Sequence, residues 1–142
     1  MSAYFLDANV VMYAVGAEHP HKASCAEILL AVAAGEIDAV TDCEVVQEIL
    51  YRYTHLGRRN EGIQVALDLL EVVPTLLPIG EAEVRRTIKL METYPHLSPR
   101  GAIHAAVMLN NSISEILSVD RDFDAIQGVR RLDPTDVRRA SR

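Results

Sequence analysis

The chain has 142 residues, of which 49% are hydrophobic and 24% are charged, and its formal net charge is −6. This length and composition predict one folded domain with its own core and exclude a disordered chain. The negative charge excludes a protein that binds nucleic acid through a broad basic surface. It leaves open a nuclease, because carboxylates that hold a catalytic metal add negative charge of their own.

The first predicted element is a short buried strand at the start of the chain. An apolar run from Tyr4 to Leu6 is followed at once by Asp7, Ala8 and Asn9. In an open parallel sheet, ligands bind beyond the C-terminal ends of the strands. Asp7 therefore stands where chemistry is expected, with Asn9 on the same loop. The alternative is that one of them only caps the following helix, since both residue types cap well.

Strands and helices alternate through the rest of the chain. Further strands are predicted at residues 37–41, 75–79, 115–119 and 129–132, and helices over about 21–34, 43–53, 61–73, 81–94 and 99–109, with a short Arg-rich helix after residue 134. Asp42 is expected to cap one helix, and Ser98 followed by Pro99 to start another. The alternation predicts a three-layer α/β domain with a parallel sheet. We expect one domain over residues 1–142, with about 135–142 as a frayed basic tail.

The two cysteines and the apolar stretches indicate the compartment. Cys25 and Cys43 share no motif spacing and lie among apolar residues, so we expect buried free thiols in a reducing cytosol. There is no signal-peptide pattern, and no apolar stretch approaches bilayer length. These features predict a soluble cytoplasmic protein.

Four acidic residues are predicted to meet at one edge of the sheet. Asp7 follows the first strand, and Asp120 and Asp122 follow the fourth. Glu48 lies about two turns into the helix after the second strand. Carboxylates from separate strands repel one another unless they share a cation, and Mg²⁺ suits such oxygen ligands, with Mn²⁺ as an alternative. A carboxylate-held pair of such ions can activate water and stabilise the leaving oxygen of a phosphodiester.

Each acid also has a structural alternative. Asp120 and Asp122 can cap the turn after their strand, and Glu48 can be a solvated helix residue. Zinc is a poor candidate, because no set of His and Cys residues has zinc-ligand spacing.

The chain is similar to a known family in four segments that span nearly its full length. They are Phe5-Leu6-Asp7-Ala8-Asn9, Val45-Val46-Gln47-Glu48-Ile49, Ser98-Pro99-Arg100 with Ala102-Ile103-His104-Ala105-Ala106, and Ser118-Val119-Asp120-Arg121-Asp122-Phe123. In this order and spacing they resemble the PIN-domain family, specifically the VapC toxins of bacterial and archaeal toxin–antitoxin pairs.

The resemblance implies a fold, an activity and partners. It implies five parallel strands in the order 3-2-1-4-5, metal-dependent endoribonuclease cleavage of RNA, a VapB-like antitoxin as partner and a homodimer. Asp7, Glu48 and Asp120 match three of the family's four acidic positions, and Asp122 matches a common auxiliary acid.

The fourth acidic position of the family is occupied here by Gly101. An acid would suit this position, because it is the third residue of a helix that Ser98 and Pro99 start, where negative charge favours the helix dipole. Glycine instead costs about 1 kcal/mol relative to alanine inside a helix. A glycine with no turn to make indicates that a functional side chain is missing, so this chain is expected to be weakened or inactive.

Other polar and apolar residues carry weaker signals. His104 lies one turn beyond Gly101 and faces the same way, but we expect it to pack in the helix face. Several arginines could contact RNA phosphates or belong to a solvated surface: Arg58, Arg59, Arg85 and Arg86. An apolar surface on the helices predicted over residues 43–53 and 61–73 favours the homodimer: Leu50, Tyr51, Tyr53, Ile63, Val65, Leu67 and Leu70.

Two other functions fit parts of the pattern. An inactive PIN module would bind antitoxin or RNA without cutting, and Gly101 favours it. A phosphatase would use Asp7 as a covalent nucleophile, but such enzymes carry a second acid two residues on, where this chain has Asn9.

Overall fold

The computed structural model describes residues 3–140, and of residues 138–140 only the backbone. Five strands form one sheet: β1 (Tyr4–Leu6), β2 (Ala39–Asp42), β3 (Thr75–Leu77), β4 (Glu115–Leu117) and β5 (Arg130–Leu132). The strands are parallel and lie in the order β3-β2-β1-β4-β5. The predicted fold class and strand order are therefore confirmed.

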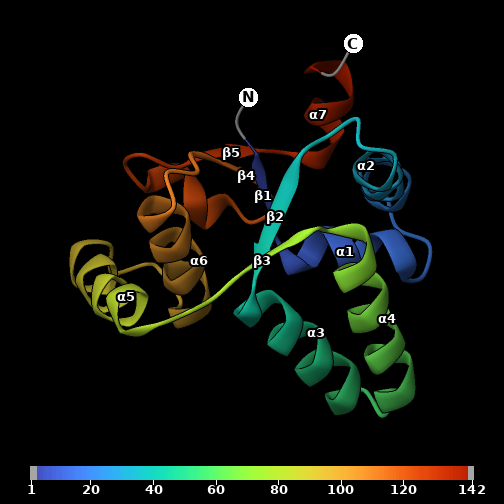
Figure 1. Ribbon diagram of the computed structural model, residues 1–142, viewed down its shortest axis with the longest axis horizontal. Helices are drawn as coiled ribbons and strands as arrows, with labels where there is room; N and C mark the ends of the chain where they lie inside the picture. Colours follow the sequence, from blue (N-terminus) through green and yellow to red (C-terminus); the bar gives the residue numbers. More distant parts are fainter. Residues whose placement is uncertain (1–2, 141–142) are drawn as a thin grey trace.

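Helices cover the sheet on both faces. They are α1 (Ala8–Val15), α2 (Lys22–Ala33), α3 (Cys43–His55), α4 (Arg59–Val72), α5 (Glu81–Thr93), α6 (Pro99–Asn110), the 3₁₀ helix η1 (Arg121–Ala125) and α7 (Pro134–Ala140). In Figure 1, α5 and α6 lie on one side of the strands, and α1, α2 and α4 lie on the other. Within residues 3–140, every helix is too short or too polar to span a bilayer.

The sheet brings the ends of three strands to one edge. β1 is central and pairs with both β2 and β4, with Leu6 opposite Leu117. These central strands are buried on both faces, as Phe5, Leu6 and Ile116 show, which is typical of a parallel sheet covered by helices. Asp7, the end of β2 and the residues after Leu117 therefore lie side by side.

Two helix starts near this edge follow from the sequence. Asp42 caps α3 by accepting a hydrogen bond from the Val45 N–H at 2.9 Å. Ser98 caps α6 by accepting from the Gly101 N–H at 3.1 Å, with Pro99 in the first turn. Both predicted caps are confirmed, and each fixes the direction in which a helix leaves the site.

The C-terminal end of the chain differs from the expectation of a frayed tail. Residues up to Ala140 form α7, which packs on α2 and buries Val137. Asp133 starts this helix by accepting from the Thr135 N–H, so a cap and an apolar contact order the segment. Residues 141–142 of the predicted tail lie outside the described residues.

Only one of the two cysteines is buried as predicted. Cys25 lies in the core, and burial raises its pKa to about 12. Cys43 is exposed, because it is the first residue of α3 and lies outside the face that packs on the core. Both thiols are free.

Candidate metal centre

Asp7 lies at the C-terminal end of β1 and is 5% exposed. One carboxylate oxygen accepts from the Ala8 N–H at 2.8 Å, so Asp7 does cap α1. The other oxygen accepts from the Ser118 hydroxyl at 2.7 Å and the Asn9 amide at 3.3 Å. Burial raises the pKa of Asp7 and outweighs the lowering by His104 and Ser118. The carboxylate is thus fixed in place, and its negative charge is costly.

Glu48 reaches the same place from α3. Its side chain is 13% exposed, and one oxygen lies 3.4 Å from the Arg100 guanidinium. Burial opposes ionisation of Glu48, but attraction by His104 and Arg100 outweighs it and lowers the pKa. Pairing of β2 with β1 explains the approach to Asp7, because it sets α3 beside the end of β1.

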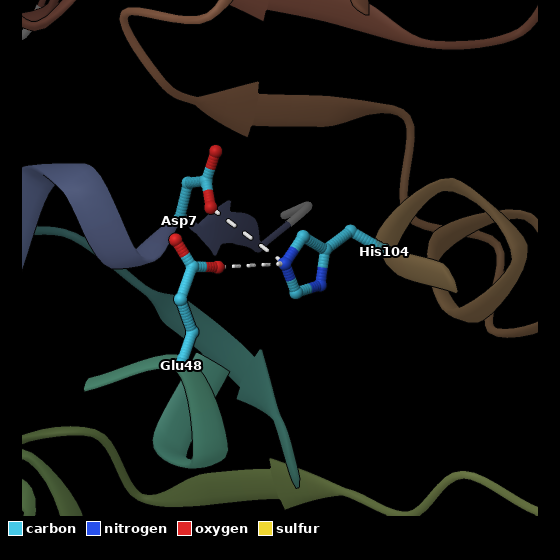
Figure 2. Close-up of side chains that lie close together, drawn as sticks. All are labelled: Asp7, Glu48 and His104. Carbon is cyan, nitrogen blue, oxygen red and sulfur yellow. Dashed lines mark ion pairs between the residues drawn. The ribbon is translucent and has the colours of Figure 1, made fainter. Parts of the chain in front are cut away.

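His104 of α6 points between these two carboxylates (Figure 2). Its Nε2 lies 3.7 Å from Asp7 Oδ1 and 4.0 Å from Glu48 Oε1, which are ion-pair distances rather than hydrogen bonds. Its Nδ1 lies 2.8 Å from Oδ2 of the fully buried Asp42. Burial opposes the imidazolium, but Asp42, Glu48 and Asp7 outweigh it and raise the pKa of His104 to about 10. The ring is therefore positively charged at neutral pH.

The three side chains meet at a cavity of about 70 Å³. Its lining consists of Asp7, Asn9, Glu48, Ser98, Arg100, Gly101, His104, Asp120 and Phe123. A water needs roughly 10–15 Å³ of such space, so the cavity can hold a cation with a few waters. Ligand atoms of Asp7, Glu48 and His104 all lie within 4.8 Å of one another.

The two acids after β4 have different positions. Asp120 lines the cavity and also caps η1, because it accepts from the Asp122 N–H at 3.0 Å. Asp122 is exposed and does not line the cavity, although we expected it among the ligands. The chain turns into η1 at Arg121, so Asp122 does not point the same way as Asp120, as it would in an extended strand.

Gly101 lines the cavity beside Asp120 and His104. Its backbone is not in the left-handed region, so no turn requires glycine. A Cβ at this position would lie 3.3 Å from Ser98 Oγ and 3.9 Å from Phe123 Cζ. A Cβ would therefore need Ser98 Oγ to move by a few tenths of an ångström, and the other neighbours lie at ordinary van der Waals contact.

Three polar residues of the site have roles that the sequence analysis missed. His104 was expected to pack in the helix face and Asp42 only to cap a helix, while Arg100 was not considered for the site. Asp42 ends a strand just as Asp7 does, so the same argument could have found it. His104 was placed on the face of Gly101, but the ligand-like direction of its ring could not be predicted.

Arg59 is exposed, and the other three arginines with a possible role in RNA contact lie in surface pairs or at a second pocket. Arg58 pairs with Glu61, and Arg85 pairs with Glu81. Arg86 donates to Asn110 at 2.8 Å. Arg85 and Arg86 line a separate pocket on α5, away from the acidic cavity.

Comparison with known proteins gives the family of the chain. Residues 4–129 match the model of the PIN domain. The chain belongs to the PIN-domain family. It is 42% identical over 128 residues to ribonuclease VapC13 of Mycobacterium tuberculosis, which covers 89% of this chain and 97% of that protein. Ribonuclease VapC23 of the same species is 32% identical over 116 residues, covering 82% and 91%.

Solved structures of PIN proteins share the fold. The crystal structure of Mycobacterium tuberculosis VapC20, a sarcin–ricin loop cleaving toxin, aligns with a TM-score of 0.73 at 16% identity and covers 87% of this chain and 94% of that one. VapBC2 from Rickettsia felis, solved on a DNA fragment from its promoter, aligns with a TM-score of 0.72 at 13% identity, covering 92% and 97%. These structures confirm the fold, and the 42% identity to VapC13 confirms the resemblance to VapC proteins.

Proposed function

We propose that this PIN domain is a metal-dependent endoribonuclease of the VapC type. The observation that carries the proposal is the meeting of Asp7, Glu48 and His104 at one cavity, with ligand atoms within 4.8 Å. Family membership and the ribonuclease relatives supply the class of reaction. The ribonuclease relatives disfavour the phosphatase alternative, as does Asn9 at the position where such enzymes carry a second acid.

The donor set fits a divalent cation. Asp7 and Glu48 offer carboxylate oxygens, and Asp120 lines the same cavity. Hard oxygen donors with room for water suit Mg²⁺ and Mn²⁺. When bound, such a cation makes water a better nucleophile and stabilises the leaving oxygen of the phosphodiester. Asp122 stays at the outside of the site and is proposed only as an auxiliary acid.

The chain's own residues position and charge this site. Ser118 and Asn9 hold the Asp7 carboxylate toward the cavity through hydrogen bonds. Arg100 is 49% exposed beside Glu48, so its guanidinium can contact an RNA phosphate. Its positive charge also offsets the negative charge of the acidic side chains. This contact would place the scissile phosphate at the mouth of the cavity.

A cleavage assay with Glu48→Gln tests the proposal. The parent should cut RNA with Mg²⁺ or Mn²⁺ and stop cutting in EDTA, and Glu48→Gln should lose about a hundredfold or more in rate, because metal position governs catalysis. Glu92→Gln, an exposed matched change on α5, should act like the parent. RNA binding without cleavage in either metal would instead establish the non-cutting module.

We propose two protein partners for the chain. VapBC complexes among its structural neighbours favour a VapB-like antitoxin. A homodimer is favoured by the exposed apolar residues Leu50, Tyr51, Ile63, Leu67 and Leu70 of α3 and α4. Tyr53 and Val65 do not belong to this surface, because the structure buries them. Light scattering at micromolar protein should give a dimer, and Leu67→Glu should give a monomer.

A further inference from the structure

We propose that His104 is a direct nitrogen ligand of the divalent cation, and that it makes the site prefer Mn²⁺ to Mg²⁺. This inference rests on the proposed function, since it assigns a ligand and a preference to the same cavity. Its basis is the Nε2 atom, which has no hydrogen-bond partner although the side chain is only 2% exposed. A buried polar atom without a partner is costly and calls for an explanation.

The unpartnered nitrogen faces the two best carboxylate ligands. Nε2 lies 3.7 Å from Asp7 Oδ1 and 4.0 Å from Glu48 Oε1. Ligand atoms about 2.1 Å from a cation lie roughly 3.0 to 4.2 Å apart around it. Both His104 separations fall in this range, so one cation can contact the ring together with either carboxylate. The ligand atoms of all three residues lie within 4.8 Å of one another, so small side-chain rotations bring them to one cation.

The nitrogen on the opposite side of the ring, Nδ1, is bound to a carboxylate, as is usual for histidines that bind metal. Nδ1 lies 2.8 Å from Asp42 Oδ2, and the other oxygen of Asp42 accepts from the Val45 N–H at 2.9 Å. A carboxylate on the far nitrogen fixes the ring orientation and increases the basicity of the ligating nitrogen. Asp42 thereby becomes a positioning residue, and the cation takes the place of the proton on Nε2.

Gly101 explains why this ligand matters in this chain. Gly101 and His104 lie three residues apart on α6, face the same cavity, and only His104 offers a donor. The helix therefore contributes nitrogen where an acid at position 101 would contribute oxygen. Carboxylate and water suit both Mg²⁺ and Mn²⁺, but Mn²⁺ is a first-row transition ion that also accepts nitrogen, whereas Mg²⁺ takes oxygen ligands. A donor set of two carboxylates and one imidazole is expected to bind Mn²⁺ about tenfold or more tighter than Mg²⁺.

Electron spin-echo spectroscopy of the full chain loaded with Mn²⁺ tests the ligand directly. The parent should show nitrogen coupling to Mn²⁺, and labelling histidine with ¹⁵N should change that coupling in the unaltered protein. His104→Gln should lose the coupling, while His55→Gln, an exposed histidine on α3, should keep it. Because the labelling needs no substitution, a failure of His104→Gln to fold does not weaken the test.

Calorimetric titration with each metal tests the preference. The parent should prefer Mn²⁺, and His104→Gln should lower that preference about tenfold. Binding of Mn²⁺ that depends on Asp7 but shows no nitrogen coupling would mean that His104 only forms an ion pair. This inference would then be wrong, and the proposed function would stand. If Mg²⁺ binds and Mn²⁺ does not, this inference is wrong and the proposed function stands. If neither metal binds, or both bind independently of Asp7, both are wrong.

Discussion

The two sides of the acidic cavity are built differently. The buried wall, formed by Asp7, Asp42, His104 and Ser118, has residues no more than 5% exposed that hold one another by hydrogen bonds and ion pairs. The open rim, formed by Arg100 and Asp120 with Asp122 outside it, is partly or fully exposed. The wall can fix a cation precisely, whereas the rim can admit a charged substrate. Gly101 lies between them and adds no side chain to either.

The largest loss of RNA cleavage is expected from removing the negative charge of Asp7 in the buried wall. Asp7→Asn keeps the shape of the side chain and its bond to the Ala8 N–H but removes a metal ligand, so RNA cleavage should fall about a hundredfold or more. The melting temperature should not fall, because burial raises the pKa of Asp7 and its charge is costly to the fold. Cleavage and thermal melting are measured together. Asp68→Asn, an exposed change on α4, is the control, and parental activity in Asp7→Asn would remove Asp7 from the site.

A gain in Mg²⁺ affinity and in cleavage rate is expected from adding an acidic side chain at position 101, between the wall and the rim. Gly101→Asp places a carboxylate in the cavity and replaces a helix glycine, so Mg²⁺ binding should tighten and cleavage should rise about tenfold or more. Gly101→Asn adds nearly the same volume without the charge and should give no gain. Metal titration and RNA cleavage of both variants measure the effect. Equal activity in Gly101→Asp and the parent would mean that position 101 is not a missing ligand.

At the rim, a smaller loss of Mg²⁺ affinity is expected, and it should differ between the two acids Asp120 and Asp122. Asp120 lines the cavity and Asp122 does not, so Asp120→Asn should lower the affinity for Mg²⁺ about tenfold. Asp122→Asn should change it about twofold or less, as exposed substitutions do. Titration of the two variants in parallel compares them directly. A larger loss in Asp122→Asn would show that η1 moves when metal binds.

The fold was largely predictable because its signals are local. Short apolar strands and the caps at Asp42 and Ser98 can each be read from neighbouring residues. Strand order came from the family resemblance, since no local pattern determines which strands pair. The packing of α7 on α2, with Val137 buried, joins segments far apart in the chain, so no local pattern predicts it.

The site was predictable only where the backbone alone places a residue. Asp7 and Asp120 follow strand ends, and Glu48 follows from the pairing of β2 with β1. The exposure of Asp122 depends on the 3₁₀ turn after β4, and the ring of His104 is oriented by Asp42, sixty-two residues away in the chain. Such side-chain directions depend on tertiary packing, which the spacing of residues does not encode.

The smallest expected effect is on stability, and it tests the charge of the wall without metal. The pKa of His104 is about 10 in the fold against about 6.5 in an unfolded chain, so its protonation stabilises the fold fully below pH 6.5. This contribution declines as the pH rises through about 10. In EDTA, the difference in melting temperature between the parent and His104→Gln should therefore shrink by about 3 °C or more between pH 7 and pH 10.5. His55→Gln should follow the parent throughout. A difference between parent and His104→Gln that stays constant with pH would mean that the ring is neutral, and that the three carboxylates around it are balanced by another charge.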